Sequence, residues 1–246
     1  MQDIIASFAQ KHRMTMTETM TEIERTFSSM LSKWYGLEVM VHFRDDLQVE
    51  AVAYNETGGV IRQQLIDVTK MRGLNTLKKH LEEDLAKAAL FKQTNRYKYH
   101  EKELRWGEIA ARDSEGNFHI ETEIIPGEKI LAMCPLNRIG LHERDTRSFS
   151  IGMKRAFHLR RIDPIMLNGT ARLKIVVDRV SKTLVETLLA EHLGASAENV
   201  SIRCTKRYVG HKSFVLTSKK LPKSVIIAVT RELREKMEVR FLKNAK

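Results

Sequence analysis

Residues 105–134, RWGEIAARDSEGNFHIETEIIPGEKILAMC, decide the fold class, because apolar side chains there recur at alternate positions. The alternation predicts strands near 105–112, 117–125 and 129–134, and it returns near 153–162 and 171–178. Turn signals separate these strands at 114–117, 126–127 and 168–169. Five short strands within about 75 residues predict a small closed β-barrel of the OB type rather than an α/β unit.

The first hundred residues are predicted to be mostly helical, with one hairpin. Thr15 and Glu18 have capping-box spacing, and they open a helix that ends at Gly36. The other predicted elements are a short helix at 3–10, strands at 37–43 and 47–54, a loop at Gly58-Gly59, and a long helix over about 74–101. The methionines of the second helix form either an adaptable binding face or ordinary core, and we favour core.

The last third is predicted to follow the order α-β-β-α-β. Ser181 is a plausible N-cap for a helix that stops at Gly194. Strands at 199–208 and 211–217 follow, then a helix opened by Pro222 and a strand at 237–242. We therefore expect an α+β multidomain chain, with a helical module and connector over 1–103, the barrel over 104–179 and a small helix-covered sheet over 180–246.

Positive charge is concentrated in this last third. The net charge of the chain is +11, and residues 171–246 hold 17 Lys and Arg against 7 Asp and Glu. Residues 1–100 are nearly balanced, with 14 basic and 13 acidic side chains, as are residues 101–170, with 11 of each. A basic module on a near-neutral remainder is typical of a nucleic-acid binder, because each neutralised phosphate releases counterions. The alternative is a solvated basic surface that maintains solubility.

The composition argues against several other classes of protein. No apolar run reaches the length of a membrane span, and the N-terminus lacks the pattern of a secretory signal, so we expect a cytoplasmic protein. The two cysteines, Cys134 and Cys204, have no zinc-site spacing and suit a reducing compartment. Nucleotide-binding, hydrolase and metalloprotease motifs are absent. We predict no catalysis, no cofactor and no small-molecule substrate, and we interpret His142-Glu143-Arg144-Asp145 as a polar loop rather than a metal or acid–base cluster.

The order of these modules resembles the front part of the bacterial transcription elongation and termination factor NusA. The similarity lies in 73–109, a helix running into a Gly-Glu-Ile strand, in 134–164, in 176–182, and in 228–239, which is similar to the end of a KH domain. The resemblance implies an N-terminal module that docks on RNA polymerase, then an OB barrel and a first KH domain that contact RNA.

Two departures from the family pattern matter. Only Ser218-Lys219-Lys220-Leu221 separates the second strand of the last module from Pro222, where a KH domain places a helix and a GxxG loop. No GxxG occurs anywhere in the chain, and the sequence stops where a second KH domain would follow. We therefore expect a shortened relative whose KH-like module is degenerate, and the base clamping of the family is not carried over.

The candidate RNA-binding residues fall into two groups. In the barrel the basic candidates are Arg138, Arg144, Arg147, Lys154, Arg155, Arg160 and Arg161, and Phe118, His119, Phe149 or His158 could stack on bases. For Phe118 and Phe157 the alternative is that they fill the barrel. In the last module the candidates are Lys206, Arg207 and Lys212 beside the turn at 208–211, and Lys219, Lys220 and Lys223 at a helix N-terminus. A solvated lysine loop is the alternative for the last three.

These observations favour a non-enzymatic, NusA-like factor that docks on RNA polymerase through its first hundred residues and holds single-stranded, nascent RNA through the remainder. It would modulate pausing, termination or antitermination. Two alternatives stay open. One is a protein-interaction adaptor that keeps the fold without RNA binding, and the other is a binder associated with the ribosome or ribosomal RNA.

Overall fold

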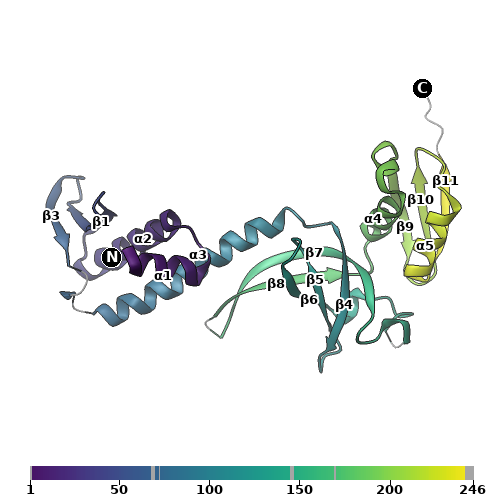
Figure 1. The fold of residues 1–246 in the computed structure, drawn as a ribbon, viewed down its shortest axis with the longest axis horizontal. Coiled ribbons are helices and arrows are strands. Elements are labelled where there is room, and N and C mark those ends of the chain that lie inside the picture. The colour runs from purple at the N-terminus through teal and green to yellow at the C-terminus, as the bar shows by residue number, and fades with distance from the viewer. Residues whose placement is uncertain (1, 68–69, 72, 145–146, 169, 242–246) are drawn as a thin grey trace. The chain divides into compact units, whose positions relative to one another are not determined.

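The computed structural model describes residues 2–67, 70–71, 73–144, 147–168 and 170–241, and Figure 1 shows its ribbon. Within these ranges the chain is an α+β protein with three separate sheets. It divides into two compact units. The first comprises Met1–Gln93 with Met166–Arg172, and the second comprises Thr94–Ile165 with Leu173–Lys246.

The first unit is built on helices whose ends follow the sequence signals. Its helices are α1 (Gln2–His12), α2 (Met16–Tyr35) and α3 (Leu74–Lys98), of which α3 continues into the second unit. The hydroxyl of Thr15 accepts from the Glu18 N–H, and the Glu18 carboxylate accepts from the Thr15 N–H. Gly36 ends α2 in the left-handed region, with φ of 66°. The predicted capping box and C-terminal stop are therefore confirmed.

A three-stranded antiparallel sheet completes the first unit. Strands β1 (Glu38–Phe43), β2 (Val49–Tyr54) and β3 (Val60–Ile66) lie in that order. The sequence predicted only the first two, because β3 is an edge strand whose side chains are exposed on both faces and show no apolar alternation. Met16, Met20 and Met30 pack against the core of this unit, which confirms the prediction that the methionines of α2 are core.

The barrel of the second unit has five strands. They are β4 (Leu104–Arg112), β5 (Phe118–Glu123), β6 (Lys129–Cys134), β7 (Lys154–Leu167) and β8 (Thr170–Asp178). The barrel closes in the order β4-β5-β6-β8-β7, with β6 and β8 parallel. Short 3-10 turns lie at Leu136–Arg138 and Arg147–Phe149. All five predicted strands are present, although β7 is longer than expected.

The C-terminal module of the second unit follows the predicted order α-β-β-α-β. Its elements are α4 (Lys182–Leu193), a 3-10 turn at Gly194–Asn199, β9 (Ile202–Tyr208), β10 (Lys212–Thr217), α5 (Lys223–Leu233) and β11 (Lys236–Phe241). The Ser181 hydroxyl caps α4 by accepting from the Leu184 N–H, as predicted. The sheet order is β11-β10-β9, and α4 and α5 pack on one of its faces.

One buried arginine joins the barrel to the C-terminal module. Arg179, the residue after β8, is fully buried, and its Nη1 lies 2.8 Å from the carboxylate of Glu232 on α5. Its Nε donates to the carboxylate of Glu143, which precedes β7. The ring centroids of Phe149 and Phe157 lie 5.4 and 5.7 Å from the guanidinium carbon. These contacts hold the two parts of the second unit in one arrangement.

Candidate nucleic-acid interface

The basic residues of the barrel do not form one surface. Consecutive residues of a strand point to opposite faces, so the neighbours Lys154 and Arg155 in β7 diverge, as do Arg160 and Arg161. Arg160 lies 3.4 Å from Asp178, Arg161 lies 2.5 Å from Asp163, and Arg155 lies 3.7 Å from Glu232. The remaining three, Arg138, Arg144 and Arg147, lie between β6 and β7, and of these Arg147 is exposed.

The aromatic candidates of the barrel are mostly core residues, which corrects the prediction that they could stack on bases. Phe118 and Phe149 are each 3% exposed, and their rings pack edge to face with centroids 5.2 Å apart. Phe157 is 1% exposed in the same cluster. His158 is also buried and lies 3.3 Å from Asp178. Phe118 and Phe157 therefore fill the barrel, which was the predicted alternative. Of the four residues predicted to stack on bases, only His119 is accessible, and it is half-buried.

Arg207 was predicted to bind RNA, and the structure corrects this prediction as well. Its side chain is 2% exposed, and its Nη2 lies 2.8 Å from the carboxylate of the buried Glu235. Burial raises the pKa of Glu235, but the Arg207 ion pair, together with hydrogen bonds from the Gly210 amide and the Ser213 hydroxyl, outweighs burial and holds that pKa below its ordinary value. Arg207 is therefore a structural residue and cannot reach a phosphate without breaking this pair.

A β-bulge explains why Arg207 points inward. Lys206 is paired with Phe214, but Cys204 is paired with Val215, so Thr205 is an extra residue in β9. The bulge reverses the alternation, which places Lys206 on the open face of the sheet and Arg207 on the inner face. No residue pattern in the sequence marks this position as a bulge.

The lysines around the N-terminus of α5 are exposed, as the hypothesis of phosphate contact requires. Lys219, Lys220 and Lys223 are all exposed, and they form no ion pair with the residues the structure describes. Pro222 is the N-cap rather than the first helical residue, and it gives the helix no side-chain cap. The first amides of α5 are thus open to an anion, as the helix N-terminus hypothesis requires.

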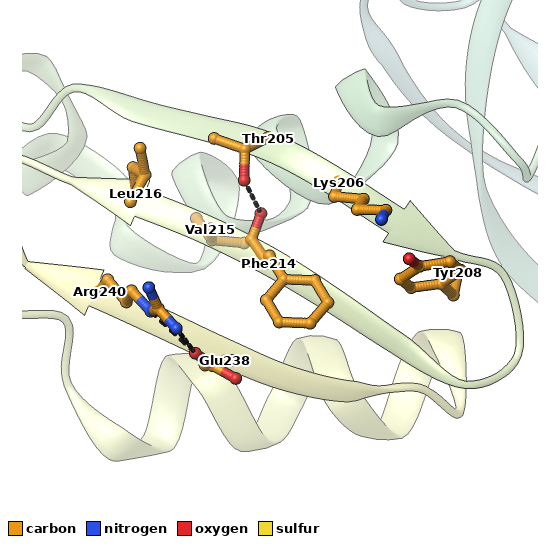
Figure 2. A pocket seen from close by; sticks show the side chains of 8 residues that line it. All are labelled: Thr205, Lys206, Tyr208, Phe214, Val215, Leu216, Glu238 and Arg240. Atoms are coloured by element: carbon orange, nitrogen blue, oxygen red, sulfur yellow. Dashed lines mark hydrogen bonds and ion pairs between the residues drawn. The ribbon is translucent and has the colours of Figure 1, made fainter.

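A shallow pocket of about 470 Å³ lies on the open face of the C-terminal sheet (Figure 2). Sequence reasoning identified only Lys206 of its lining, with Lys212 beside it on the same strand pair. The other lining residues are Thr205, Tyr208, Phe214, Val215, Leu216, Glu238 and Arg240. The signal available in the sequence was the mixture of basic and aromatic side chains in residues 203–216, from which we predicted two strands and the basic candidates but not the aromatic ones.

The loop containing His142 and Glu143, which we predicted to be a polar loop rather than a metal or acid–base cluster, packs these two side chains into the fold. Glu143 is 4% exposed and accepts from Arg179. The His142 Nε2 lies 3.0 Å from the Leu233 carbonyl, and a Cβ added at Gly210 would lie 2.4 Å from the ring. The loop is therefore packed between the barrel and the C-terminal module. Asp145, the last member of the cluster, lies outside the described residues.

The described part of the chain holds little other site chemistry. No cluster of three or more His, Cys, Asp or Glu side chains there could hold a metal ion. Cys134 and Cys204 are buried and unpaired, and burial raises the pKa of both thiols. Among these residues no helix is both long and apolar enough to cross a bilayer.

No protein-family model matches this chain, and no curated protein matches it. The fold and the surface chemistry alone therefore define the class: an α+β protein with a five-stranded barrel and a basic α-β-β-α-β module.

Proposed function

We propose that this chain is a non-enzymatic, cytoplasmic RNA-binding transcription factor of the NusA type. It docks on RNA polymerase through residues 1–103 and contacts nascent RNA through residues 104–246, and so modulates pausing, termination or antitermination. The observation that carries the proposal is the order of parts along one chain. A near-neutral helical module is followed by a long helix, a five-stranded barrel and a strongly basic α-β-β-α-β module.

The topology of the barrel supports its assignment as an OB-type barrel. OB folds are five-stranded Greek-key barrels that bind oligonucleotides. The closed order β4-β5-β6-β8-β7 places β8 between β6 and β7, so the chain crosses over rather than running up and down around the barrel. We infer that this barrel is a scaffold that contributes exposed cations, such as Arg147 and Lys154, to an RNA path.

The C-terminal module is best described as KH-like without the clamp. Its helices cover one face of a three-stranded mixed sheet, in which β10 pairs parallel with β11 and antiparallel with β9. Between β10 and α5 there are only Ser218–Leu221 and the capping Pro222, with no glycine. Without a GxxG loop the module lacks the close amide contacts by which a KH domain clamps an RNA backbone. We therefore propose binding driven by charge, with weak sequence selectivity.

The first unit has the surface expected of a protein-docking module. Several large apolar side chains are exposed there, with exposed fractions from 41 to 69%: Trp34, Tyr35, Leu37, Met40, Val60, Ile61 and Leu65. A groove of about 290 Å³ lies between α2 and the sheet, and its lining includes Tyr35, Leu37 and Ile61. Exposed apolar patches of this kind mark interaction sites.

Binding of the full chain to purified bacterial RNA polymerase tests the docking half of the proposal. We expect capture of the polymerase core enzyme and no capture of purified ribosomes. Ile61→Glu should abolish capture, because it places a charge on the apolar surface of the first unit. The matched control is Leu131→Glu on β6 of the barrel, since Leu131 is 58% and Ile61 54% exposed. Capture of ribosomes in place of polymerase would support the ribosome-associated alternative and overturn the proposal.

A titration with single-stranded RNA tests the RNA-binding part of the proposal and distinguishes it from the adaptor alternative. A chain that captures polymerase but binds no RNA at low salt would be a protein-interaction adaptor. Salt-dependent RNA binding is the expected outcome, because residues 171–246 hold an excess of ten positive charges.

A further inference from the structure

We propose that the open face of the sheet β11-β10-β9 is a stacking platform for the bases of single-stranded RNA. It would replace the missing GxxG loop as the surface that contacts RNA bases. This inference rests on the proposed RNA-binding function and assigns it to a particular surface. The opposite face of the sheet is packed against α4 and α5, with Cys204, Val215 and Val239 in their shared core.

The strand register defines the residues of the open face. Tyr208 pairs with Lys212, and Lys206 pairs with Phe214, so these four side chains share one face. On the other side of β10, Lys212, Phe214 and Leu216 pair with Lys236, Glu238 and Arg240. Arg203 is paired with Leu216 and joins the same face. Figure 2 shows the Tyr208 and Phe214 rings on this face together with the basic side chains of Lys206 and Arg240.

The charge of this face favours a polyanion. It holds five basic side chains, Arg203, Lys206, Lys212, Lys236 and Arg240, against one acidic side chain, Glu238. Glu238 accepts from Lys212 at 2.6 Å and from Arg240 at 2.8 Å, and these hydrogen bonds lower the pKa of its carboxyl. The other three cations form no ion pair with a carboxylate of the described residues. They are available to neutralise phosphates.

The two rings provide the surface for bases. The centroids of Tyr208 and Phe214 are 6.3 Å apart, with 74° between the ring planes, and 46% of Tyr208 is exposed. The Lys206 ammonium lies 4.7 Å from the Tyr208 centroid, and the Lys212 ammonium lies 4.9 Å from the Phe214 centroid. In the absence of RNA each ring thus contacts the ammonium group of a lysine, whose long side chain can move away.

Relative interaction strengths predict that a base displaces these cations. Exposed cation–π contacts are weak, whereas stacking of a base on an aromatic side chain is stronger and tolerates any sequence. A displaced ammonium can then bind the phosphate beside the stacked base. The platform therefore selects unpaired bases, since the bases of a duplex are already stacked on each other.

The proposal is tested by fluorescence anisotropy of the full chain with a labelled oligouridine of about 12 nucleotides, a length that covers one such site. Tyr208→Ala should lower the affinity by at least about fivefold and leave the salt slope unchanged, because a neutral ring is lost. Tyr208→Phe should retain the affinity. Lys206→Ala should reduce the slope of log K against log [KCl] by about 0.7, the value for one phosphate contact on a single strand.

A second aromatic provides the matched control. Tyr99 follows α3 and is 87% exposed, so Tyr99→Ala removes an exposed ring outside the platform. Tyr208→Leu keeps apolar bulk in case the alanine variant fails to fold, and it should weaken binding in the same way. With an RNA duplex of equal length, Tyr208→Ala and the wild type should bind alike.

The outcomes separate the platform from the proposed function. Salt-dependent RNA binding that is the same in the Tyr208 variants and in Tyr99→Ala would overturn the platform and leave the RNA-binding function standing. Equal weakening of duplex and single-strand binding by Tyr208→Ala would overturn base stacking. Absence of RNA binding by the wild-type chain would overturn both, and an acidic protein partner would then be the fitting occupant of this face.

Discussion

The guanidinium of Arg179 and the carboxylate of Glu143 form an ion pair inside the second unit, with Nε 3.1 and 3.0 Å from the two carboxylate oxygens. Arg179 is fully buried and Glu143 is 4% exposed. The two residues are separated by 36 positions in the chain. This pair and the contact of Arg179 with Glu232 connect the barrel to the module that carries the proposed RNA surface.

Arg179→Met should therefore destabilise the protein strongly. It removes the guanidinium that pairs with the buried Glu143 carboxylate, and removal of one partner of a buried pair costs about 3–5 kcal/mol in the free energy of unfolding. Urea denaturation of the full chain measures this loss. Arg161→Met is the matched control, because Arg161 is 61% exposed and its pair with Asp163 should contribute less than about 1 kcal/mol. Similar losses for both variants would contradict the assignment of Arg179 as the joining residue.

Arg207 and Lys206 are neighbours in β9 and should respond in opposite ways to substitution. Arg207→Met should lower the free energy of unfolding by roughly 3 kcal/mol, because Glu235 is buried with it, and should leave the salt slope of RNA binding unchanged. Lys206→Met should leave stability nearly unchanged and reduce the salt slope. A loss of stability in Lys206→Met with a reduced salt slope in Arg207→Met would contradict the inward orientation of Arg207.

Phe118→Ala tests the correction that this ring is core. Phe118 is 3% exposed and packs against Phe149, so its truncation should cost about 3–5 kcal/mol in the free energy of unfolding. RNA affinity, measured below the unfolding transition, should remain within about twofold of the wild type. A large loss of affinity in a stable variant would restore Phe118 as a stacking residue.

Stability should fall at acidic pH partly through Asp178. Burial raises its pKa, but hydrogen bonds from His158 and the Ser181 amide outweigh burial and lower the pKa to about 2. A depressed pKa in the folded state stabilises the protein above the ordinary value of 3.8 and loses this effect as the pH falls toward 2. The stabilisation is about 2 kcal/mol, of which about 1 kcal/mol disappears between roughly pH 5 and pH 3.

Urea denaturation across this pH range compares the wild type with Asp178→Asn. Between roughly pH 5 and pH 3 the free energy of unfolding should fall by about 1 kcal/mol less in the variant than in the wild type, because the amide of the variant does not titrate. Parallel curves for the two proteins would mean that the Asp178 carboxyl has an ordinary pKa in the folded state.

Local signals predicted most of the fold. The capping box at Thr15, the N-cap at Ser181 and the stop at Gly36 depend on residues within one or two turns, and all three are observed. The barrel strands also followed from alternation alone. The strand β3 was missed because its side chains are exposed on both faces, so burial leaves no periodic pattern in its sequence.

The candidate site was predicted less well, because the contacts of its side chains are made with residues that are distant in the sequence. Lys206 and Arg207 are adjacent basic residues, and the sequence does not distinguish their environments. The bulge in β9 exposes Lys206, whereas Arg207 is buried against Glu235, which lies 28 residues further along the chain. The barrel phenylalanines have the alternating pattern of either core or stacking residues. Tyr208 and Phe214 became neighbours only through the register of β9 and β10, which the sequence does not fix.

The most direct test of the account is the affinity of the full chain for single-stranded RNA measured over a range of KCl concentrations. Neutralisation of three to five phosphates by the open sheet face predicts a linear fall of log K with log [KCl], with a slope of roughly −2 to −3.5. A slope near zero, or no RNA binding at low salt, would contradict the claim that this chain is an RNA-binding protein.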